Sequence, residues 1–180
     1  MDLSDKELLD QFTNDETRNY AFNILVRQYQ KRLYWHIRKI LLDHDDTNDV
    51  LQNVFIKVWR NLAGFKAESQ LYTWLYRIAT NECSRHFRRN KNQMKNSGLA
   101  EKMVGELSGT DSENSDAILF KFQQAIMQLP ERQRIVFNLR YYDELSYDDI
   151  GQILNSSVNS LKTNYHYASE KIKQYLIDHA

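Results

Sequence analysis

Glycine and proline are scarce in this chain, and their scarcity limits its possible folds more than any other feature. Its 180 residues include only 5 Gly and 1 Pro. Tight turns between strands depend on these residues, and no run of β-branched residues alternates convincingly with polar ones. The sequence therefore predicts an all-α fold. Its length allows one domain or two small ones.

Near the end of the chain, two helical patterns flank a short polar break, Asn155-Ser156-Ser157. Ser146 and Asp149 come close to a capping box at the start of the first pattern, and Ser157 is an N-cap candidate for the second. In the second pattern, apolar residues recur every three or four positions and predict one buried face: Val158, Leu161, Tyr165, Ala168, Ile172 and Leu176. The opposite face carries Asn159, Lys162, Thr163, His166 and Glu170.

Two short helices joined by a tight turn, the second polar on its outer face, are typical of the helix-turn-helix that enters the DNA major groove. A plain helical hairpin would give the same pattern. The rest of the chain has to distinguish the two.

Three further helical patterns occupy the first half of the chain. The first has apolar positions at Phe22, Leu25, Val26, Tyr29, Leu33, Ile37 and Ile40, and its other sides carry Arg27, Lys31, Arg32, Arg38 and Lys39. The second has a wide apolar face formed by Val50, Leu51, Val54, Phe55, Val58, Trp59 and Leu62. The third has its apolar face at Leu71, Trp74, Leu75, Ile78 and Ala79.

The acidic segment from Asp43 to Thr47 suits the N-terminus of the second of these helices, because carboxylates stabilise the positive end of a helix dipole. As a calcium loop it lacks the glycine at position six and the closing glutamate. We therefore expect no metal site and no cofactor. Cys83 is the only cysteine, which excludes an internal disulfide and indicates a reducing compartment.

The charges sum to zero but are segregated along the chain. The segment from Met1 to Glu16 has six acids and one base, and the segment from Arg77 to Lys95 has six bases and one acid. Basic side chains at a helix C-terminus can simply favour the helix dipole, but six exceed what capping needs. A basic stripe of this kind can hold phosphates even on a neutral protein.

The basic stripe overlaps the outer side of the third helix, which presents Arg77, Asn81, Ser84, Arg85 and Arg88, with Tyr72, Tyr76 and Phe87 between them. Guanidinium groups interleaved with aromatic rings can hold a phosphate backbone while the rings stack on unpaired bases. For any one ring a place in the core is the simpler interpretation, and we expect it for Trp74.

A change in composition divides the chain. The segment from Asn96 to Asp116 has five acids, one base, three glycines and no sustained apolar period. It is predicted to be a flexible acidic linker. The linker separates a helical module at residues 1–95 from a smaller one at residues 117–180.

Three segments resemble conserved regions of the bacterial sigma-70 family, in the expected order. Thr47 to Trp59, TNDVLQNVFIKVW, resembles the helix that binds core RNA polymerase, and Tyr72 to Asn81, YTWLYRIATN, resembles the promoter-opening helix. Leu129 to Phe137, LPERQRIVF, together with Glu144 to Tyr147 and the final helix, resembles the reader of the upstream promoter element. The two-module layout is similar to that of the extracytoplasmic-function (ECF) class.

The resemblance implies a role for each matching position. Core polymerase would be bound by Asp49, Gln52 and Asn53. The minus-10 element would be bound by Phe65, Lys66, Ser69, Gln70, Arg77, Asn81, Ser84, Arg85, Arg88 and Arg89. The minus-35 element would be bound by Asn159, Ser160, Lys162, Thr163, His166 and Tyr167. The family usually has Glu at the position of Asn53, and often Arg at Asn164, Tyr167 and Ser169. One charge-assisted contact to polymerase is therefore expected to be missing, and fewer phosphate contacts are expected at the upstream element.

The resemblance thus implies an ECF-type sigma factor that binds core RNA polymerase and directs transcription from promoters through their minus-10 and minus-35 elements. Its partners would be core polymerase, promoter DNA and an anti-sigma factor. The sequence contains no nucleophile paired with a base and no glycine-rich phosphate loop, so no catalytic residues and no enzyme activity are expected. There is no secretory signal and no bilayer-length apolar run, which predicts a cytoplasmic protein without membrane insertion.

Two other functions remain open at this point. A stand-alone helix-turn-helix repressor would explain the final module but neither the basic-aromatic helix nor the segment from Asp49 to Trp59. It would also be expected to dimerise on a palindrome. A helical adaptor with no nucleic-acid role would leave the segregated charges unexplained.

Overall fold

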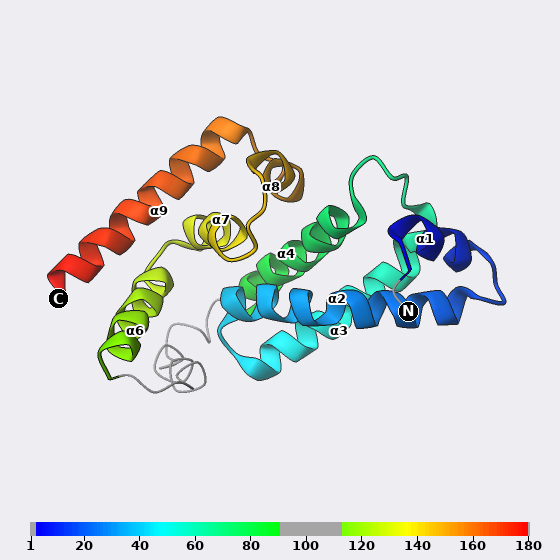
Figure 1. Cartoon of the computed structure of the whole chain (residues 1–180), viewed down its shortest axis with the longest axis horizontal. Helices are drawn as coiled ribbons and strands as arrows, with labels where there is room; N and C mark the ends of the chain where they lie inside the picture. The colour runs from blue at the N-terminus through cyan, green and yellow to red at the C-terminus, as the bar shows by residue number, and fades with distance from the viewer. Residues whose placement is uncertain (1–2, 91–112, 180) are drawn as a thin grey trace. The chain divides into compact units, whose positions relative to one another are not determined.

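The computed structural model describes residues 3–90 and 113–179, with side chains described at 3–89 and 118–179. Within these ranges the chain forms α-helices and one 3-10 turn, with no strand, which confirms the all-α prediction (Figure 1). The helices are α1 (Asp5–Thr13), α2 (Arg18–Leu41), α3 (His44–Asn61), η1 (Leu62–Gly64), α4 (Leu71–Asn90), α6 (Glu113–Met127), α7 (Glu131–Tyr141), α8 (Tyr147–Leu154) and α9 (Val158–Asp178).

The chain divides into two compact units, of which the first holds α1 to α4 and the second holds α6, α7, α9 and most of α8. Most of the predicted linker, Asn96 to Asp116, lies outside the described residues. Its last four positions already belong to α6, which begins at Glu113.

Helix α1 was not predicted from the sequence. It begins with a complete capping box, in which the Ser4 hydroxyl accepts from the Glu7 amide at 3.3 Å and the Glu7 carboxylate accepts from the Ser4 amide at 2.9 Å. Leu8 and Phe12 bury the inner face of α1. The Tyr29 hydroxyl of α2 donates to Asp5 at 2.9 Å, and burial together with this hydrogen bond raises the pKa of Tyr29.

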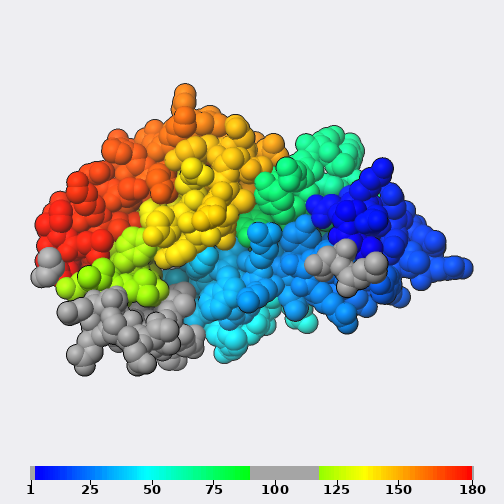
Figure 2. Space-filling model, viewed as in Figure 1, coloured from blue at the N-terminus to red at the C-terminus, as the bar shows by residue number. Residues whose placement is uncertain are grey.

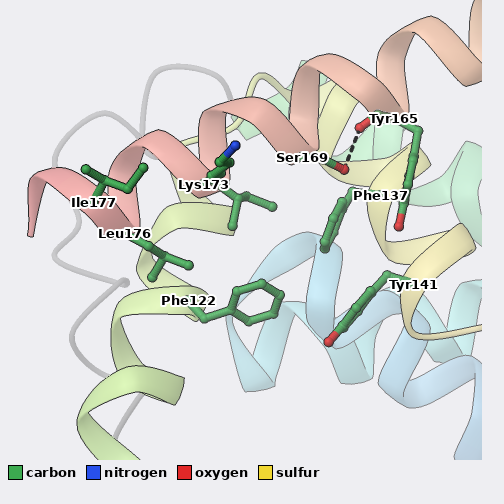
Figure 3. A pocket seen from close by; sticks show the side chains of 9 residues that line it. Phe122, Phe137, Tyr141, Tyr165, Ser169, Lys173, Leu176 and Ile177 are labelled. Atoms are coloured by element: carbon green, nitrogen blue, oxygen red, sulfur yellow. Dashed lines mark hydrogen bonds between the residues drawn. The ribbon is translucent and has the colours of Figure 1, made fainter. Parts of the chain in front are cut away.

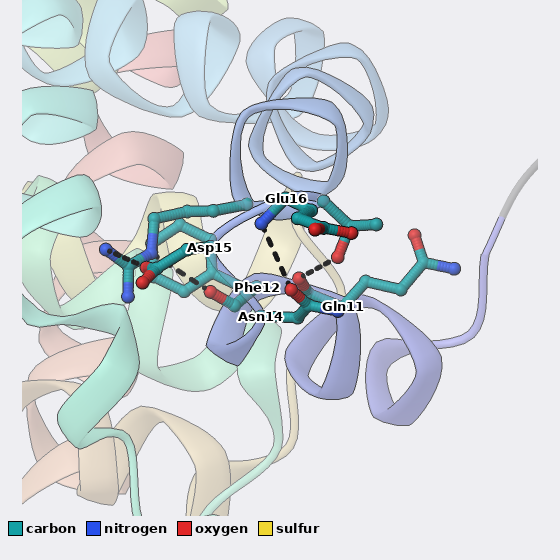
Figure 4. A network of polar contacts seen from close by, with 7 residues as sticks. Gln11, Phe12, Asn14, Asp15 and Glu16 are labelled. Atoms are coloured by element: carbon teal, nitrogen blue, oxygen red, sulfur yellow. Dashed lines mark hydrogen bonds and ion pairs between the residues drawn. The ribbon is translucent and has the colours of Figure 1, made fainter.

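A network of polar contacts fixes the turn between α1 and α2 (Figure 4). The Thr17 hydroxyl donates to the carbonyl of Gln11 at 2.7 Å, and the Arg18 guanidinium donates to the carbonyl of Phe12 at 3.2 Å. These bonds satisfy carbonyl groups that the end of a helix leaves without an intrahelical partner. The short helix α1 is thereby held on α2.

Helices α2 and α3 form the centre of the first unit. Leu42, with φ of 69°, ends α2, and the Asp43 carboxylate caps α3 by accepting from the Asp46 amide at 3.0 Å. The buried core contains most of the residues that periodicity predicted, among them Leu25, Leu33, Ile37, Ile40, Val50, Val54, Val58, Leu62, Leu71, Leu75 and Ala79.

Arg38 corrects one prediction for α2. The sequence placed it on an outer side of the helix, but only 4% of its surface is exposed. His36 and Ile37 beside it are also buried, and His36 is hydrogen-bonded to the Thr80 hydroxyl of α4 at 2.9 Å. Helix α2 is therefore covered on more than one side near its C-terminal end, which a single apolar stripe does not reveal.

In the second unit, α6 and α7 pack against α9. Their shared core contains Ala125, Ile126, Leu129, Phe137, Ala168 and Ile172. The predicted inner face of α9 is confirmed, because Leu161, Ala168 and Ile172 are buried, while Val158, Tyr165 and Leu176 are half-buried. Its predicted polar face is exposed throughout.

The helix-turn-helix of α8 and α9 has the predicted caps. The hydroxyl of Ser146 accepts from the Asp149 amide at 3.1 Å, and that of Ser157 accepts from the Ser160 amide at 3.3 Å. Between the helices, the Ser156 amide donates to the Gly151 carbonyl at 3.1 Å. A Cβ at Gly151 would lie 3.0 Å from the Ser156 carbonyl oxygen, so the turn closes tightly because position 151 lacks a side chain.

Asn155 provides a test of this turn, because its φ of 48° is left-handed. We expect Asn155→Val to destabilise the second unit by about 1–2 kcal/mol, since a β-branched side chain clashes with the backbone in this conformation. Asn155→Gly is the matched control and should be nearly neutral. Urea unfolding followed by circular dichroism measures both, and equal midpoints for the two variants would contradict the turn geometry.

Within the described ranges, no helix is both long enough and apolar enough to cross a membrane.

Candidate functional site

One exposed surface lies on α3. Val50, Val54 and Val58 are buried on the inner side of this helix, while Asp49, Gln52 and Asn53 are exposed on its outer side. Ile56 follows one turn later with 42% of its surface exposed. An exposed strip that combines polar groups with a large apolar side chain is typical of a protein–protein interface.

The sequence analysis did not single out Ile56. The available signal was its position, since Ile56 falls outside the apolar face predicted for α3. Beside this strip, a hydrogen-bonded chain joins α2 to the start of α3. The Tyr34 hydroxyl lies 2.8 Å from His44 Nδ1, and His44 Nε2 lies 3.0 Å from the amide nitrogen of Asn48.

A second surface follows α4. Arg77, Asn81, Arg85, Arg88 and Arg89 are exposed and Ser84 is half-buried, while Leu71, Leu75, Ala79 and Cys83 are buried on the other side of the helix. Among the described residues, Arg77, Arg88 and Arg89 have no acidic partner within ion-pair distance. The predicted basic face therefore exists as one continuous strip along the helix.

The aromatic residues predicted to interleave with this strip do not all face outward. Tyr76 is buried and lies against the His36 ring, with centroids 4.7 Å apart, so it cannot stack on a base. Tyr72 and Phe87 are half-buried. Trp74, expected in the core, is also only half-buried, and its ring lies 5.2 Å from that of Phe65.

The Phe65–Trp74 contact attaches the loop that precedes α4 to the start of that helix. In this loop Lys66 and Gln70 are exposed and Ser69 is half-buried. The Gln70 carbonyl accepts from the Trp74 amide at 3.2 Å. Arg85 lies 14 residues beyond Leu71, about 21 Å along the helix axis. The predicted minus-10 residues thus form two groups, one in the loop that precedes α4 and one along α4 itself.

A third surface is the outer face of α9, where Asn159, Lys162, Thr163, His166 and Tyr167 are exposed. In Figure 2 the orange-to-red side chains of α9 form one edge of the second unit, beside the yellow α7. Lys162 Nζ lies 5.9 Å from the ring centroid of Tyr147 on α8, near the outer limit for a cation–π contact. Ser160 is half-buried and takes part in the cap of α9.

The second unit also contains an apolar groove of about 530 Å³ that the sequence did not predict (Figure 3). It lies between α6, α7 and α9, and Phe122, Phe137, Tyr141, Tyr165, Ser169, Ile172, Lys173, Leu176 and Ile177 line it. The rings of Phe137 and Tyr165 stack with centroids 5.5 Å apart. Of the lining residues, only Lys173 carries a charge, so the groove has the character of a contact surface.

Both units match known protein families. Residues 25–93 match the family Sigma-70 region 2, and residues 119–172 match Sigma-70, region 4.

Similar full-length proteins are found in several bacteria. The RNA polymerase sigma-H factor of Pseudomonas aeruginosa is 31% identical over 96% of this chain and 93% of its own length. The ECF RNA polymerase sigma factor SigW of Bacillus subtilis is 31% identical over 88% of this chain and 90% of its own. The ECF RNA polymerase sigma-E factor of Escherichia coli K12 is 31% identical over 94% and 93%.

Solved structures share the fold. The sigma factor RpoE from Bartonella quintana, in complex with the anti-sigma factor NepR, has a TM-score of 0.66 at 20% identity and covers 86% of this chain and 96% of its own. CnrH, in complex with the cytosolic domain of CnrY, has a TM-score of 0.71 at 19% identity and covers 98% of this chain and 99% of its own.

Proposed function

The chain belongs to the sigma-70 family, in its extracytoplasmic-function group, and from this premise we propose how its surfaces divide the work of promoter recognition. The protein directs promoter-specific transcription initiation as a partner of core RNA polymerase. The first module, residues 1–95, binds polymerase and the minus-10 element. The second, residues 117–180, binds the minus-35 element.

Core polymerase is bound through Asp49, Gln52 and Asn53 on α3. The supporting observation is that these side chains are exposed on a helix whose apolar face is already buried. Ile56 extends the strip by an apolar contact of the kind that loses water on binding. Asn53 supplies an amide where the family usually has a carboxylate, so this position contributes less charge.

The minus-10 element is bound by the basic strip of α4 together with the loop from Phe65 to Gln70. This proposal is carried by the exposure of four side chains on one helix face: Arg77, Asn81, Arg85 and Arg88. Successive phosphates of a DNA strand can be bound by cations that are spaced along one helix. Phe65 is the first residue of this loop, and its ring packs against that of Trp74. A captured base would stack there and pair its edge with loop side chains.

The minus-35 element is bound by the outer face of α9, the second helix of the helix-turn-helix. Six side chains near its N-terminal half are proposed to face the major groove: Asn159, Ser160, Lys162, Thr163, His166 and Tyr167. Asn164, Tyr167 and Ser169 lack the charge that the family often has there, so fewer phosphates are held. The chemistry of RNA synthesis belongs to the polymerase, and the protein itself acts without catalysis, in the cytoplasm.

An anti-sigma factor is proposed as a further partner, since one structurally similar sigma factor occurs with an anti-sigma factor. Co-purification of the tagged protein from its host should yield core polymerase and one additional small protein. Recovery of polymerase alone, in inducing and non-inducing growth conditions alike, would contradict this part of the proposal.

Selection of binding sites from randomised duplex DNA tests whether the two modules bind two separate promoter elements. We expect the holoenzyme, core polymerase plus this protein, to select two conserved blocks separated by a spacer of fixed length. The protein alone should select neither block strongly. A palindrome selected without polymerase would contradict the proposal and favour a stand-alone repressor.

Lys162 tests whether α9 reads bases. If its amine contacts a base edge, Lys162→Ala changes which upstream blocks the holoenzyme selects, and this is the result we expect. If it contacts phosphate only, binding weakens uniformly and the salt dependence falls by about one unit. Lys171→Ala, also exposed on α9 but farther along the helix, is the matched control for loss of charge. Unchanged preferences for both variants would exclude base reading by Lys162.

A further inference from the structure

Glu82 on α4 is a buried carboxylate that faces two cations. Its Oε1 contacts Lys57 Nζ from α3 directly, while Arg85 Nη1, one turn along α4, lies 3.7 Å away. The exposed fractions of the three side chains differ: 9% for Glu82, 33% for Lys57 and 54% for Arg85. Within the described residues, no other cation reaches this carboxylate.

The two cations compete for one negative charge. A buried carboxylate needs a close partner, because an uncompensated charge in a low dielectric is costly. Lys57 is that partner here. The guanidinium of Arg85 can therefore leave Glu82 and bind a phosphate instead. Without Lys57, Glu82 would have only Arg85 to neutralise it, and an i,i+3 pair on one helix can close into a direct ion pair.

We propose that Lys57 is a positioning residue for DNA binding: by neutralising Glu82, it leaves the Arg85 guanidinium available to the promoter. The inference rests on the proposed function, in which Arg85 contacts minus-10 DNA. It also connects two surfaces, because Lys57 lies on the helix that carries Asp49, Gln52 and Asn53. A residue on the polymerase-binding helix thus sets the charge available on the DNA-binding helix.

The experiment compares holoenzymes carrying Lys57→Met, Glu82→Gln, both substitutions, or Arg85→Ala. Affinity for a duplex selected by the wild-type holoenzyme is measured over a range of salt concentrations. Lys57→Met should weaken binding several-fold and lower the salt dependence by about one unit, and Arg85→Ala should have the same effect. Glu82→Gln should leave the salt dependence unchanged. The double variant, which has the wild-type net charge, should recover wild-type binding.

Arg60→Met is the matched control, because Arg60 is exposed on the same helix and has no acidic partner among the described residues. It removes the same charge and should leave the salt dependence near the wild-type value. If Lys57→Met fails to fold, as judged by its thermal midpoint, Lys57→Gln replaces it in the single and double variants.

Three results would overturn the inference. If Glu82→Gln impairs binding as much as Lys57→Met, the contact is a structural bridge between the helices. If Arg60→Met weakens binding and lowers the salt dependence as much as Lys57→Met, the effect comes from the loss of net charge alone. If Arg85→Ala leaves the salt dependence unchanged, Arg85 does not contact DNA, and both the proposed minus-10 site and this inference are wrong. The first two results would overturn the inference alone.

Discussion

Phe137→Ala is expected to remove most of the stability of the second unit while the helices of the first stay folded. Phe137 is buried in its core and contacts rings from α6, α9 and its own helix α7. Its ring centroid lies 6.2 Å from that of Phe122, 5.5 Å from that of Tyr165 and 5.1 Å from that of Tyr141. Replacing a buried Phe by Ala costs about 3–5 kcal/mol. A module of this size has a total stability of only about 3–9 kcal/mol.

The measurement is limited proteolysis of the full chain combined with a thermal scan by circular dichroism. Fragments from α6 to α9 should be degraded quickly in Phe137→Ala, while a fragment containing α1 to α4 persists. Ile118→Ala is the control, because that side chain is 65% exposed on α6 and should change stability by less than about 0.5 kcal/mol. Equal protease resistance of the two variants would contradict the core that we describe.

Asp49→Ala combined with Gln52→Ala is expected to weaken binding to core polymerase at least about tenfold, equivalent to ~1.4 kcal/mol. Both side chains are exposed in the free protein, so their loss should barely change its stability. At an interface from which water is excluded, the partner groups would be left unpaired, and that loss is much larger.

Fluorescence anisotropy with labelled protein and purified core polymerase gives the affinity. The control pair is Asp10→Ala with Gln128→Ala, which removes the same two residue types from exposed positions on other elements. The account predicts wild-type affinity for the control pair. It predicts a thermal midpoint near the wild-type value for both double variants. Equal affinity for the two double variants would remove the polymerase site from α3.

Local chemistry made much of this fold predictable. Ser146 and Ser157 were predicted as N-caps from their hydroxyl groups and positions, and both accept the expected backbone amide. The apolar spacing of α9 predicted its inner face because every third or fourth residue returns to the same side of a helix. These signals involve residues close together in the sequence.

The failures have three different physical causes. Periodicity identifies the side of a helix that meets its nearest neighbour, but not how many neighbours surround it. Arg38 was placed outside for this reason and is buried. Helix α1 was missed because its nine residues bury only Leu8 and Phe12, too few for a clear period. The groove of the second unit combines residues from α6, α7 and α9, so no single segment contains its pattern.

The candidate sites depended on a different kind of information. Exposure of the basic strip on α4 followed from helix geometry, and the structure confirms it for Arg77, Asn81, Arg85 and Arg88. The assignment of that strip to the minus-10 element came from resemblance to the family, because exposure does not specify a partner. The contact of Lys57 with Glu82 joins residues 25 positions apart and could be found only in the structure.

Run-off transcription tests the central claim most directly. Purified core polymerase is given a linear duplex carrying the two selected blocks, with or without this protein, and the transcripts are sized. The account predicts a single transcript that starts just downstream of the minus-10 block, requires the protein and disappears when either block is scrambled. Transcription that is independent of the protein, or a protein that binds the duplex but leaves polymerase inactive, would contradict it.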